Sequence, residues 1–300
     1  MTLGWLALAR GTIDRMAERR RDEDWVAAAW AGSRVLVVDE QGRVPVRLTD
    51  RPELVFTPSR RAPKGQRILL GVDEDKIAYF AVRAPIPDDL HDAEPAGLRR
   101  IGALLDDLHS TLLTQAVAMA AWHGAHGFCP RCGGATKAIA AGHVRVCLHD
   151  GTEQYPRLDP AVIMLVADTE DRVLLARGTT WPERRQSVLA GFIEPGESIE
   201  QAVVREVKEE VGLAVHDVQY CGSQPWPLPQ SLMLGFTCRA EAGQRLITDQ
   251  TELVEARWYT RDELKAAALN GDVLLPGRVS IARQLIEYWY GADLPGGWGL

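Results

Sequence analysis

The apolar residues of the first hundred positions occur in short runs. These runs lie in RVLVVDEQGRVPVRL, ELVFTP, QRILLGV and KIAYFAVRAP, and Gly, Pro and Asp residues separate them. Short runs rich in Val, Ile, Leu and Phe between turn-forming residues predict β-strands. We therefore expect a sheet in the first third of the chain.

The pattern becomes helical between residues 97 and 122. From Leu98 to Leu113, leucine and isoleucine recur at three- and four-residue steps, which predicts one amphipathic helix. Further on, AVIMLVAD (161–168) predicts a buried strand and VSIARQLIEYWY (279–290) predicts a closing helix. Strand, loop and helix patterns alternate through the rest of the chain, so we expect an α/β fold there.

The length of 300 residues suggests about two domains. We place an N-terminal α/β domain at 1–122, a small module rich in Cys and Gly at 123–155, and a larger α/β domain at 156–300. With 46% hydrophobic and 25% charged residues, the composition is that of an ordinary globular protein.

The net charge of −7 argues against a protein that binds duplex DNA or an anionic membrane by broad electrostatic attraction. No apolar run approaches the ~18 residues of a transmembrane helix. The N-terminal MTLGWLALARG is too short for a span and lacks the basic segment of a signal peptide. Five cysteines are an odd number and do not indicate a secreted disulfide framework. These features predict a reduced, cytoplasmic protein.

A capped helix is predicted within the segment Gly191 to Leu213, GFIEPGESIEQAVVREVKEEVGL. Ser198 followed three residues later by Gln201 forms a capping box that begins a helix, and Gly212 suits a left-handed helix end. Ile and Val residues at four-residue steps give this helix one apolar face for the core.

Three carboxylates lie together on the adjacent face of this helix. Glu206, Glu209 and Glu210 are spaced i, i+3 and i+4, so their charges repel one another and destabilise a bare helix. A hard divalent cation such as Mg²⁺ or Mn²⁺ relieves that repulsion. For the carboxylates alone, a solvated acidic face is the alternative interpretation.

The whole segment resembles the Nudix box, because it matches every fixed position of the pattern G-x5-E-x7-R-E-U-x-E-E-x-G-U, where U is a bulky apolar residue. The resemblance implies attack of water on a phosphorus of a nucleoside diphosphate joined to another group. It assigns metal binding to Glu206 and Glu210, with Glu209 close by, and makes Glu210 the candidate for base chemistry. It also implies that Arg205 orients a glutamate and that the carbonyl of Ala190 contacts metal.

A proline-rich segment, SQPWPLPQS (223–231), follows the box. Its prolines fix the backbone, and by itself the segment fits either a substrate loop or a rigid loop with a buried Trp. It resembles the SQPWPFPxS motif of NADH pyrophosphatases, except that Leu228 replaces the family's Phe and offers no π face. The resemblance assigns substrate contacts to Gln224, Pro225, Trp226, Pro227, Leu228, Pro229, Gln230 and Ser231.

Two aromatic residues resemble those that stack on the nicotinamide ring in this family. Tyr155 stands just before the AVIMLVAD strand and Phe192 follows the first glycine of the box. Core packing is the alternative role for both rings.

Three further assignments come from the resemblance alone. TELVEARWYTRDEL resembles the segment whose first Glu completes the metal site, which assigns this role to Glu252 rather than Glu255. Ala282 matches a position whose backbone meets substrate, and Arg99 resembles a substrate-contacting arginine of the N-terminal domain.

The cysteine module begins with CPRCGG, in which Cys129 and Cys132 form half of a zinc knuckle. Cys147 follows in CLHD, where Asp150 stands at the family's last Cys. Asp150, His149 or His143 could supply the fourth ligand of a zinc site. Alternatively, the site has decayed and packing alone holds the module. Cys221 and Cys238 have the pattern of core residues.

Together, these features predict a Nudix α/β/α sandwich with a mixed sheet, preceded by a zinc-ribbon-like module and a smaller α/β N-terminal domain. The resemblance implies hydrolysis of NADH or NAD to AMP and nicotinamide mononucleotide with two or three Mg²⁺ or Mn²⁺ ions, removal of NAD caps from RNA 5′ ends, and a homodimer. Alternatives are a Nudix hydrolase of ADP-ribose or another dinucleotide, and a non-catalytic nucleotide sensor. A zinc-finger module that binds nucleic acid would need a complete metal site and a basic face.

Overall fold

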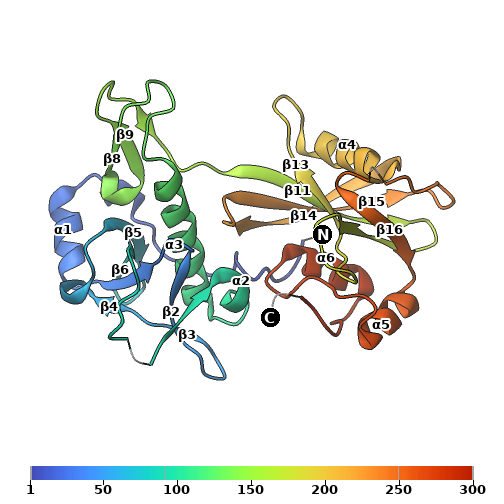
Figure 1. Ribbon diagram of the computed structural model, residues 1–300, viewed down its shortest axis with the longest axis horizontal. Helices are drawn as coiled ribbons and strands as arrows, with labels where there is room; N and C mark the ends of the chain where they lie inside the picture. Colours follow the sequence, from blue (N-terminus) through green and yellow to red (C-terminus); the bar gives the residue numbers. More distant parts are fainter. Residues whose placement is uncertain (1, 91, 249, 299–300) are drawn as a thin grey trace. The chain divides into compact units, whose positions relative to one another are not determined.

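The computed structural model describes residues 2–90, 92–248 and 250–298, and the chain forms two compact units (Figure 1). Of the described residues, the C-terminal unit contains 2–9, 159–225, 231–248 and 250–298, and the N-terminal unit contains 10–90, 92–158 and 226–230. No helix among the described residues is both long enough and apolar enough to cross a bilayer.

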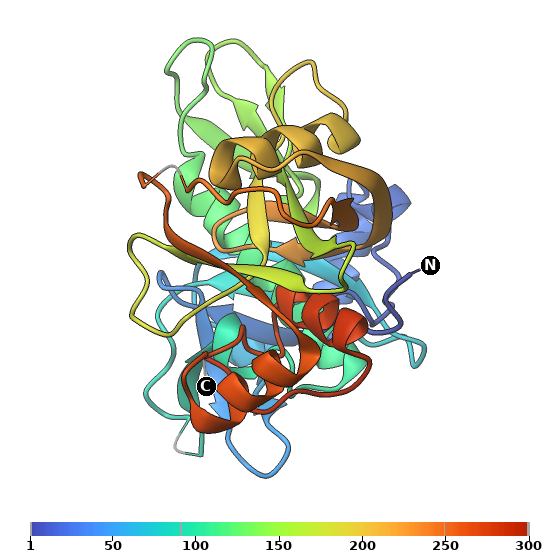
Figure 2. The ribbon, with the colours of Figure 1, turned by 90° about the vertical axis from the view of Figure 1, so that its right-hand side faces the viewer.

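The C-terminal unit is a six-stranded mixed sheet between helical layers, with α4 on one face and α5 and α6 on the other (Figure 2). The strand order is β14-β15-β11-β12-β16, and β13 also pairs with β11. β11 and β15 are parallel, whereas β11–β13 and β12–β16 are antiparallel. The elements are β11 (Asp159–Asp168), β12 (Val173–Gly178), β13 (Leu189–Phe192), α4 (Ile199–Val211), β14 (Val215–Trp226), β15 (Ser231–Ala240), β16 (Leu253–Tyr259), α5 (Arg261–Asn270) and α6 (Ile281–Tyr290).

The alternation of side chains along β11 creates two cores. Val162, Met164 and Val166 belong to the cluster that contains the apolar face of α4, and Ile163 and Leu165 belong to the cluster that contains α5 and α6. Successive residues of a strand point to opposite faces, so this continuously apolar strand is buried on both sides. The expected α/β/α sandwich is confirmed.

The first nine residues are part of the C-terminal unit. The backbone N–H of Leu3 donates to the carbonyl of Cys221 at 2.7 Å, and Leu6 belongs to the core beneath α6. The apolar N-terminal run is therefore used as packing for this unit.

The N-terminal unit contains two small sheets and a ribbon of three strands. The sheet orders are β4-β1-β6-β5 and β3-β2-β7, and the ribbon order is β10-β9-β8. The elements are η1 (Ala17–Arg19), α1 (Glu23–Ala31), β1 (Arg34–Val38), β2 (Arg43–Arg47), β3 (Glu53–Leu54), β4 (Thr57–Pro58), η2 (Ser59–Arg61), β5 (Gln66–Val72), β6 (Ala78–Arg83), β7 (Glu94–Gly97), α2 (Leu98–Ile101), α3 (Asp107–Ala125), β8 (Thr136–Ile139), η3 (Ala140–Gly142), β9 (Val144–Cys147) and β10 (Glu153–Gln154). Each of the four apolar runs forms one or two of the expected strands.

The expectation of one helix across residues 97–122 is wrong. The segment contains α2 and, after a turn, α3. The side chain of Asp106 accepts a hydrogen bond from the N–H of His109 at 2.8 Å, and such a cap begins a new helix. The leucine spacing continues across the turn and so does not reveal the break.

The helix α1 was not anticipated. Asp22 caps it by accepting from the N–H of Trp25 at 3.0 Å. Its alanine-rich sequence favours a helix. However, its apolar residues do not form the clear three- and four-residue spacing that predicts an amphipathic helix.

Candidate active site and metal centres

The helix α4 begins after Ser198 and ends before Gly212, as the sequence predicts. Ser198 and Gln201 form the reciprocal capping box, and Gly212 ends the helix in the left-handed conformation with φ 73°. Its Val residues pack into the core, which leaves Glu206 and Glu210 at the edge of that face, where they are 9% and 6% exposed. Burial of two carboxylates is costly unless charge or hydrogen bonds compensate it.

Arg205 joins the groups around this constellation. Its guanidinium donates to Glu197 at 2.5 Å, Glu206 at 2.8 Å and Glu209 at 3.0 Å, and also to the backbone carbonyl of Phe192 at 2.9 Å. The hydrogen bond with Glu197 raises the pKa of Arg205 and lowers that of Glu197. One cation thus fixes three carboxylates and the end of β13.

The pKa of Glu206 is raised, whereas that of Glu197 is lowered. Burial raises the pKa of Glu206, Arg205 opposes this, and the charges of Glu209 and Glu252 raise it further. The N–H of Thr179 donates to the backbone carbonyl of Glu252 at 2.9 Å. Glu255, the less favoured candidate, instead forms an ion pair with Arg177 at 3.6 Å.

Gly191 is required by a close approach. A Cβ at this position would lie 1.9 Å from the carboxyl carbon of Glu206. In the sheet, Gly191 pairs with Val162 and its neighbour Ala190 pairs with Ile163. The backbone of β13 therefore lies directly against Glu206. This cluster of carboxylate and carbonyl oxygens fits the donor set that Mg²⁺ and Mn²⁺ prefer.

Gln224, in the proline-rich segment, is fully buried. Its Oε1 accepts from the N–H of Leu8 at 3.2 Å, and its Nε2 donates to the carbonyl of Val279 at 2.9 Å. Both ends of the amide are thus used within the C-terminal unit, where they fix the start of the proline-rich segment between the N-terminus and the approach to α6.

The middle of the segment, residues 226–230, belongs to the N-terminal unit. The guanidinium carbon of Arg99 lies 5.3 Å from the centroid of the Trp226 ring, a cation–π contact. The peptide between Leu228 and Pro229 is cis, Pro227 is buried and Pro229 is exposed. Gln230 precedes Ser231, which begins β15 in the other unit.

The two aromatic candidates are not core residues. Tyr155 is 63% exposed and Phe192 is 59% exposed. The hydroxyl of Tyr155 donates to Glu153 at 2.8 Å, and that carboxylate raises the pKa of the phenol. The two residues belong to different units. Core packing is excluded for both rings.

Glu153 was missed by the sequence analysis. It binds both Tyr155 and Arg21, and the Arg21 contact is 2.7 Å. The available signal was its position two residues before Tyr155, because alternate residues of an extended chain face the same side.

Ala282 lies in the first turn of α6 and is 2% exposed. Its N–H donates to the Oγ of Ser280, which caps the helix, at 3.2 Å. The backbone N–H of Ala282 is therefore already used by the helix cap.

The ribbon contains two turns of the same construction. In the first, the N–H of Cys129 donates to Gly134 and the N–H of Gly133 donates to Cys129, at 2.8 and 2.9 Å. In the second, the N–H of Cys147 donates to Thr152 and the N–H of Gly151 donates to Cys147, at 2.9 and 3.1 Å. Gly133 and Gly151 have φ of 72° and 73°. The second turn therefore places Asp150 at the position equivalent to Cys132.

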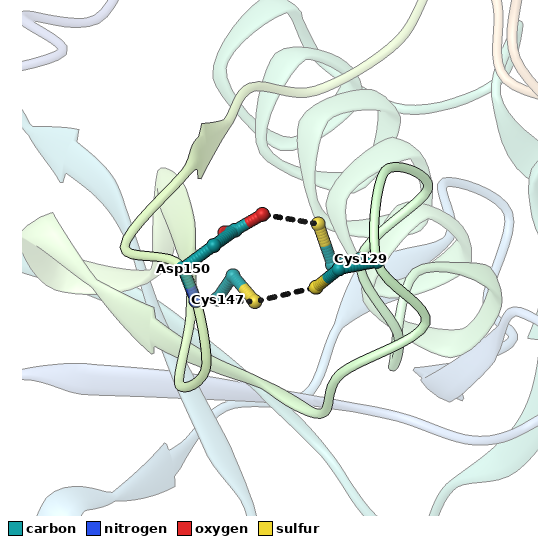
Figure 3. Close-up of side chains that lie close together, drawn as sticks. Cys129, Cys147 and Asp150 are labelled. Atoms are coloured by element: carbon teal, nitrogen blue, oxygen red, sulfur yellow. Dashed lines mark hydrogen bonds between the residues drawn. The ribbon is translucent and has the colours of Figure 1, made fainter.

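Cys129, Cys147 and Asp150 point toward one another (Figure 3), and together with Cys132 they converge as zinc ligands would. Their donor atoms lie within 4.8 Å of one another; Cys132 and Cys147 are 3.4 Å apart, and Cys129 and Asp150 are 3.9 Å apart. Ligand atoms of a tetrahedral site with Zn–S bonds of about 2.3 Å are separated by about 3.8 Å. A hydrogen bond from the N–H of Thr152 holds the pKa of Asp150 below its usual range. The residues thus fit Zn²⁺.

The histidine alternatives do not share this geometry. The Nε2 of His143 is 2.7 Å from the carbonyl of Leu69, and burial lowers the pKa of His143 to about 4. His149 lies outside the cluster of convergent ligand atoms. The geometry therefore favours Asp150 as the fourth ligand.

Three family models match consecutive parts of the chain, and they identify the class of protein that this sandwich and its glutamate helix define. The NADH pyrophosphatase-like rudimentary NUDIX domain matches residues 23–122, the NADH pyrophosphatase zinc ribbon domain matches 125–155, and the NUDIX domain matches 157–277.

Relatives extend the match to nearly the whole chain. A protein named NAD-capped RNA hydrolase NudC from Mycobacterium bovis is 43% identical over 298 residues, which cover 94% of each chain. The human NAD-capped RNA hydrolase NUDT12 is 38% identical over 232 residues, which cover 73% of this chain and 49% of the human protein. A crystal structure of a NUDIX hydrolase from Nitrosomonas europaea covers 56% of this chain and 95% of its own, at 21% identity and a TM-score of 0.44. The chain belongs to the NADH pyrophosphatase (NAD-capped RNA hydrolase) family of Nudix hydrolases.

We predict that Gly191→Ala displaces the carboxylate of Glu206, since no room exists for a methyl group between them. A displacement of about 1 Å at a reacting centre can lower turnover ~10²-fold. Steady-state hydrolysis of NADH measures the loss. Gly4→Ala is the matched control, because a Cβ there meets nothing within 4 Å. Equal activity of both variants would contradict the assignment.

We predict that the purified protein contains about one zinc per chain, and that Cys129→Ser loses both the zinc and thermal stability. Asp150→Cys should retain zinc, since it restores a second thiolate in an equivalent turn. Cys221→Ala, a buried cysteine outside the ribbon, should also retain it. Elemental analysis and thermal melts measure both effects. A folded, active wild-type protein without zinc would show that the ribbon is held by packing alone.

Proposed function

We propose that this protein hydrolyses the diphosphate of NADH or NAD, so that water enters and AMP and nicotinamide mononucleotide leave. The observation that carries the proposal is the buried pair Glu206 and Glu210 beside Arg205, on a helix whose neighbouring strand has no side chain at Gly191. A site of this kind combines oxygen ligands for a hard cation with a group that can accept a proton. The names of relatives across 94% of the chain give the substrate class.

Glu206, Glu209, Glu210, Glu252 and the carbonyl of Ala190 would hold two or three Mg²⁺ or Mn²⁺ ions. Such ions, when bound, supply a Lewis acid for the diphosphate and lower the pKa of water. Two observations support this assignment. The charges of Glu209 and Glu252 raise the pKa of Glu206, and Glu210 is buried.

Arg205 acts in this proposal as a positioning residue. Its hydrogen bonds to Glu206 and Glu209 set the direction in which their remaining oxygens point. Glu210 is buried on the same helix and is the group that we propose accepts the proton of the attacking water.

Recognition of the nicotinamide is proposed for the exposed rings of Tyr155 and Phe192. Flat ligands stack on such rings, and Glu153 holds Tyr155 through its hydroxyl. In the proline-rich segment, Gln224 would act by holding the backbone, since its amide is used internally. Arg99 would act together with Trp226, which it contacts.

We also propose that NAD caps at RNA 5′ ends are substrates, because the NudC and NUDT12 relatives are named for that reaction. A homodimer in the cytoplasm completes the proposal.

The experiment that tests this function is a product assay on NADH, NAD and NAD-capped RNA, with and without Mg²⁺ or Mn²⁺. We expect AMP and nicotinamide mononucleotide from the dinucleotides only when metal is present. Glu210→Gln should lower kcat about 10²–10⁴-fold, because the amide cannot accept the proton, with a smaller change in KM.

Glu200→Gln is the matched control, since Glu200 is an exposed residue in the first turn of the same helix. It should retain wild-type turnover. Metal-independent activity, or normal turnover of Glu210→Gln, would remove the α4 cluster from the chemistry.

We predict that Tyr155→Ala and Phe192→Ala lower kcat/KM for NADH far more than for ADP-ribose, which has the same diphosphate and no nicotinamide. Stacking on an aromatic ring contributes about 1–3 kcal/mol per base, so the loss on NADH should be about 5-fold to 150-fold. Tyr220→Ala removes a comparably exposed ring from β14 and should leave the ratio of the two substrates unchanged. Equal losses on both substrates would assign the two aromatics to structure alone.

A further inference from the structure

A basic pocket lies within the N-terminal unit, at the junction of α1, β5 and the ribbon turn η3. It has a volume of about 520 Å³, within the range of about 300–1,000 Å³ that is usual for small-ligand sites. The helix α1 and the turn η3 are in contact, as are β5 and η3. The pocket therefore joins the part matched by the rudimentary NUDIX model to the zinc ribbon.

The charges around the pocket are mostly positive. Arg20, Arg21, Arg67 and Lys137 line it, with Glu23 as the acidic lining residue. Arg21 is compensated by an ion pair with Glu153. For Arg67 and Lys137, no ion pair is found among the described residues. In a chain of net charge −7, this local excess of positive charge favours an anionic ligand.

Arg20 adds to this charge from a partly buried position. Its guanidinium donates to the carbonyl of Arg15 at 3.1 Å. Burial and the charge of the neighbouring Arg15 lower its pKa, and Glu18 opposes this shift. An anion in the pocket would relieve this repulsion.

An aromatic platform lies beside the charges. The guanidinium carbon of Arg67 is 4.0 Å from the centroid of the Trp30 ring, and Trp30 meets Phe80 edge to face at 5.2 Å. One face of the Arg67 guanidinium thus rests on Trp30. Nucleic acid bases stack on aromatic rings and on guanidinium planes, which are the usual platforms for single-stranded RNA.

The turn η3 also lines the pocket, and its backbone conformation is unusual. Ala140, Ala141 and Gly142 are all left-handed, with φ of 51°, 50° and 88°. Left-handed alanines cost energy, and such conformations gather at functional sites. A Cβ on Gly142 would lie 2.7 Å from the carbonyl of Arg67, so the turn is packed tightly against β5 beside the platform.

We propose that this pocket binds a nucleotide of the single-stranded RNA that follows the NAD cap, with a base on the Arg67–Trp30 platform and phosphates near Arg20 and Lys137. The inference rests on the proposed removal of NAD caps. It separates that substrate from free NADH, because only a capped RNA has further nucleotides beyond the NAD moiety to occupy the pocket.

The test uses the full-length protein, with a short fluorescent oligoribonucleotide that carries a 5′-hydroxyl in place of a cap. Lys137→Glu, a change of an exposed residue, should weaken binding at least tenfold. Lys137→Ala should reduce the slope of log affinity against log salt by about 0.7, as expected for one phosphate contact with a single strand. Arg67→Lys keeps the charge but removes the planar platform, so affinity should fall while the salt slope stays unchanged.

Arg51→Glu is the matched control, since Arg51 is exposed in the same unit and does not line the pocket. Wild-type affinity in Lys137→Glu and Arg67→Lys, or losses equal to that of Arg51→Glu, would overturn the proposal. Equally tight binding of a fully paired RNA duplex would also overturn it, because stacking requires a free base.

A second measurement compares kcat/KM for NAD-capped RNA with that for NAD. Lys137→Glu should lower the ratio of the two about tenfold, and an unchanged ratio would count against the pocket. If the wild-type protein hydrolysed neither substrate, the proposed function would fail, while the oligoribonucleotide binding would still decide the pocket.

Discussion

The approach of Glu206 to the backbone of β13 is the constraint on which the catalytic unit depends. A carboxylate buried against a strand is costly unless charge and hydrogen bonds compensate it. Gly191 supplies the space and Arg205 supplies the charge. The remaining features follow from this contact, since the capping box and the apolar face of α4 hold the helix at the depth that brings Glu206 to the strand. The same contact explains why metal, when present, would meet carboxylates that are already oriented.

The parts of this arrangement that are local in sequence could be predicted. The ends of α4 follow from Ser198, Gln201 and Gly212, because capping depends on residues within one turn. The strand β11 and the helix α6 follow from continuous apolar or periodic patterns. The split between α2 and α3 could not be predicted from leucine spacing, because the spacing continues through the turn and the deciding group is the single side chain of Asp106.

Contacts between residues that are distant in sequence could not be predicted either. Gln224 forms hydrogen bonds with Leu8 and Val279, which are distant in sequence. The motif alone therefore does not show that both ends of the Gln224 amide are bonded within the protein. The exposure of Tyr155 and Phe192 could not be derived either, since an aromatic residue next to an apolar strand fits a core equally well. The fourth zinc ligand was left open for a different reason: Asp150 interrupts the cysteine pattern, and only the backbone of the second turn, which repeats the first, favours it over His149 and His143.

The odd number of thiols in the ribbon has a consequence for its oxidation. A ribbon with four cysteines can close two disulfides when its metal is lost, and then has no thiol left to reverse them. Here Cys129, Cys132 and Cys147 can form only one disulfide among themselves, because Asp150 cannot take part. One thiol always remains beside that bond, and a neighbouring thiolate attacks a disulfide directly. The substitution of a carboxylate for a thiol thus gives the metal-free ribbon an internal means of rearranging its own cross-link.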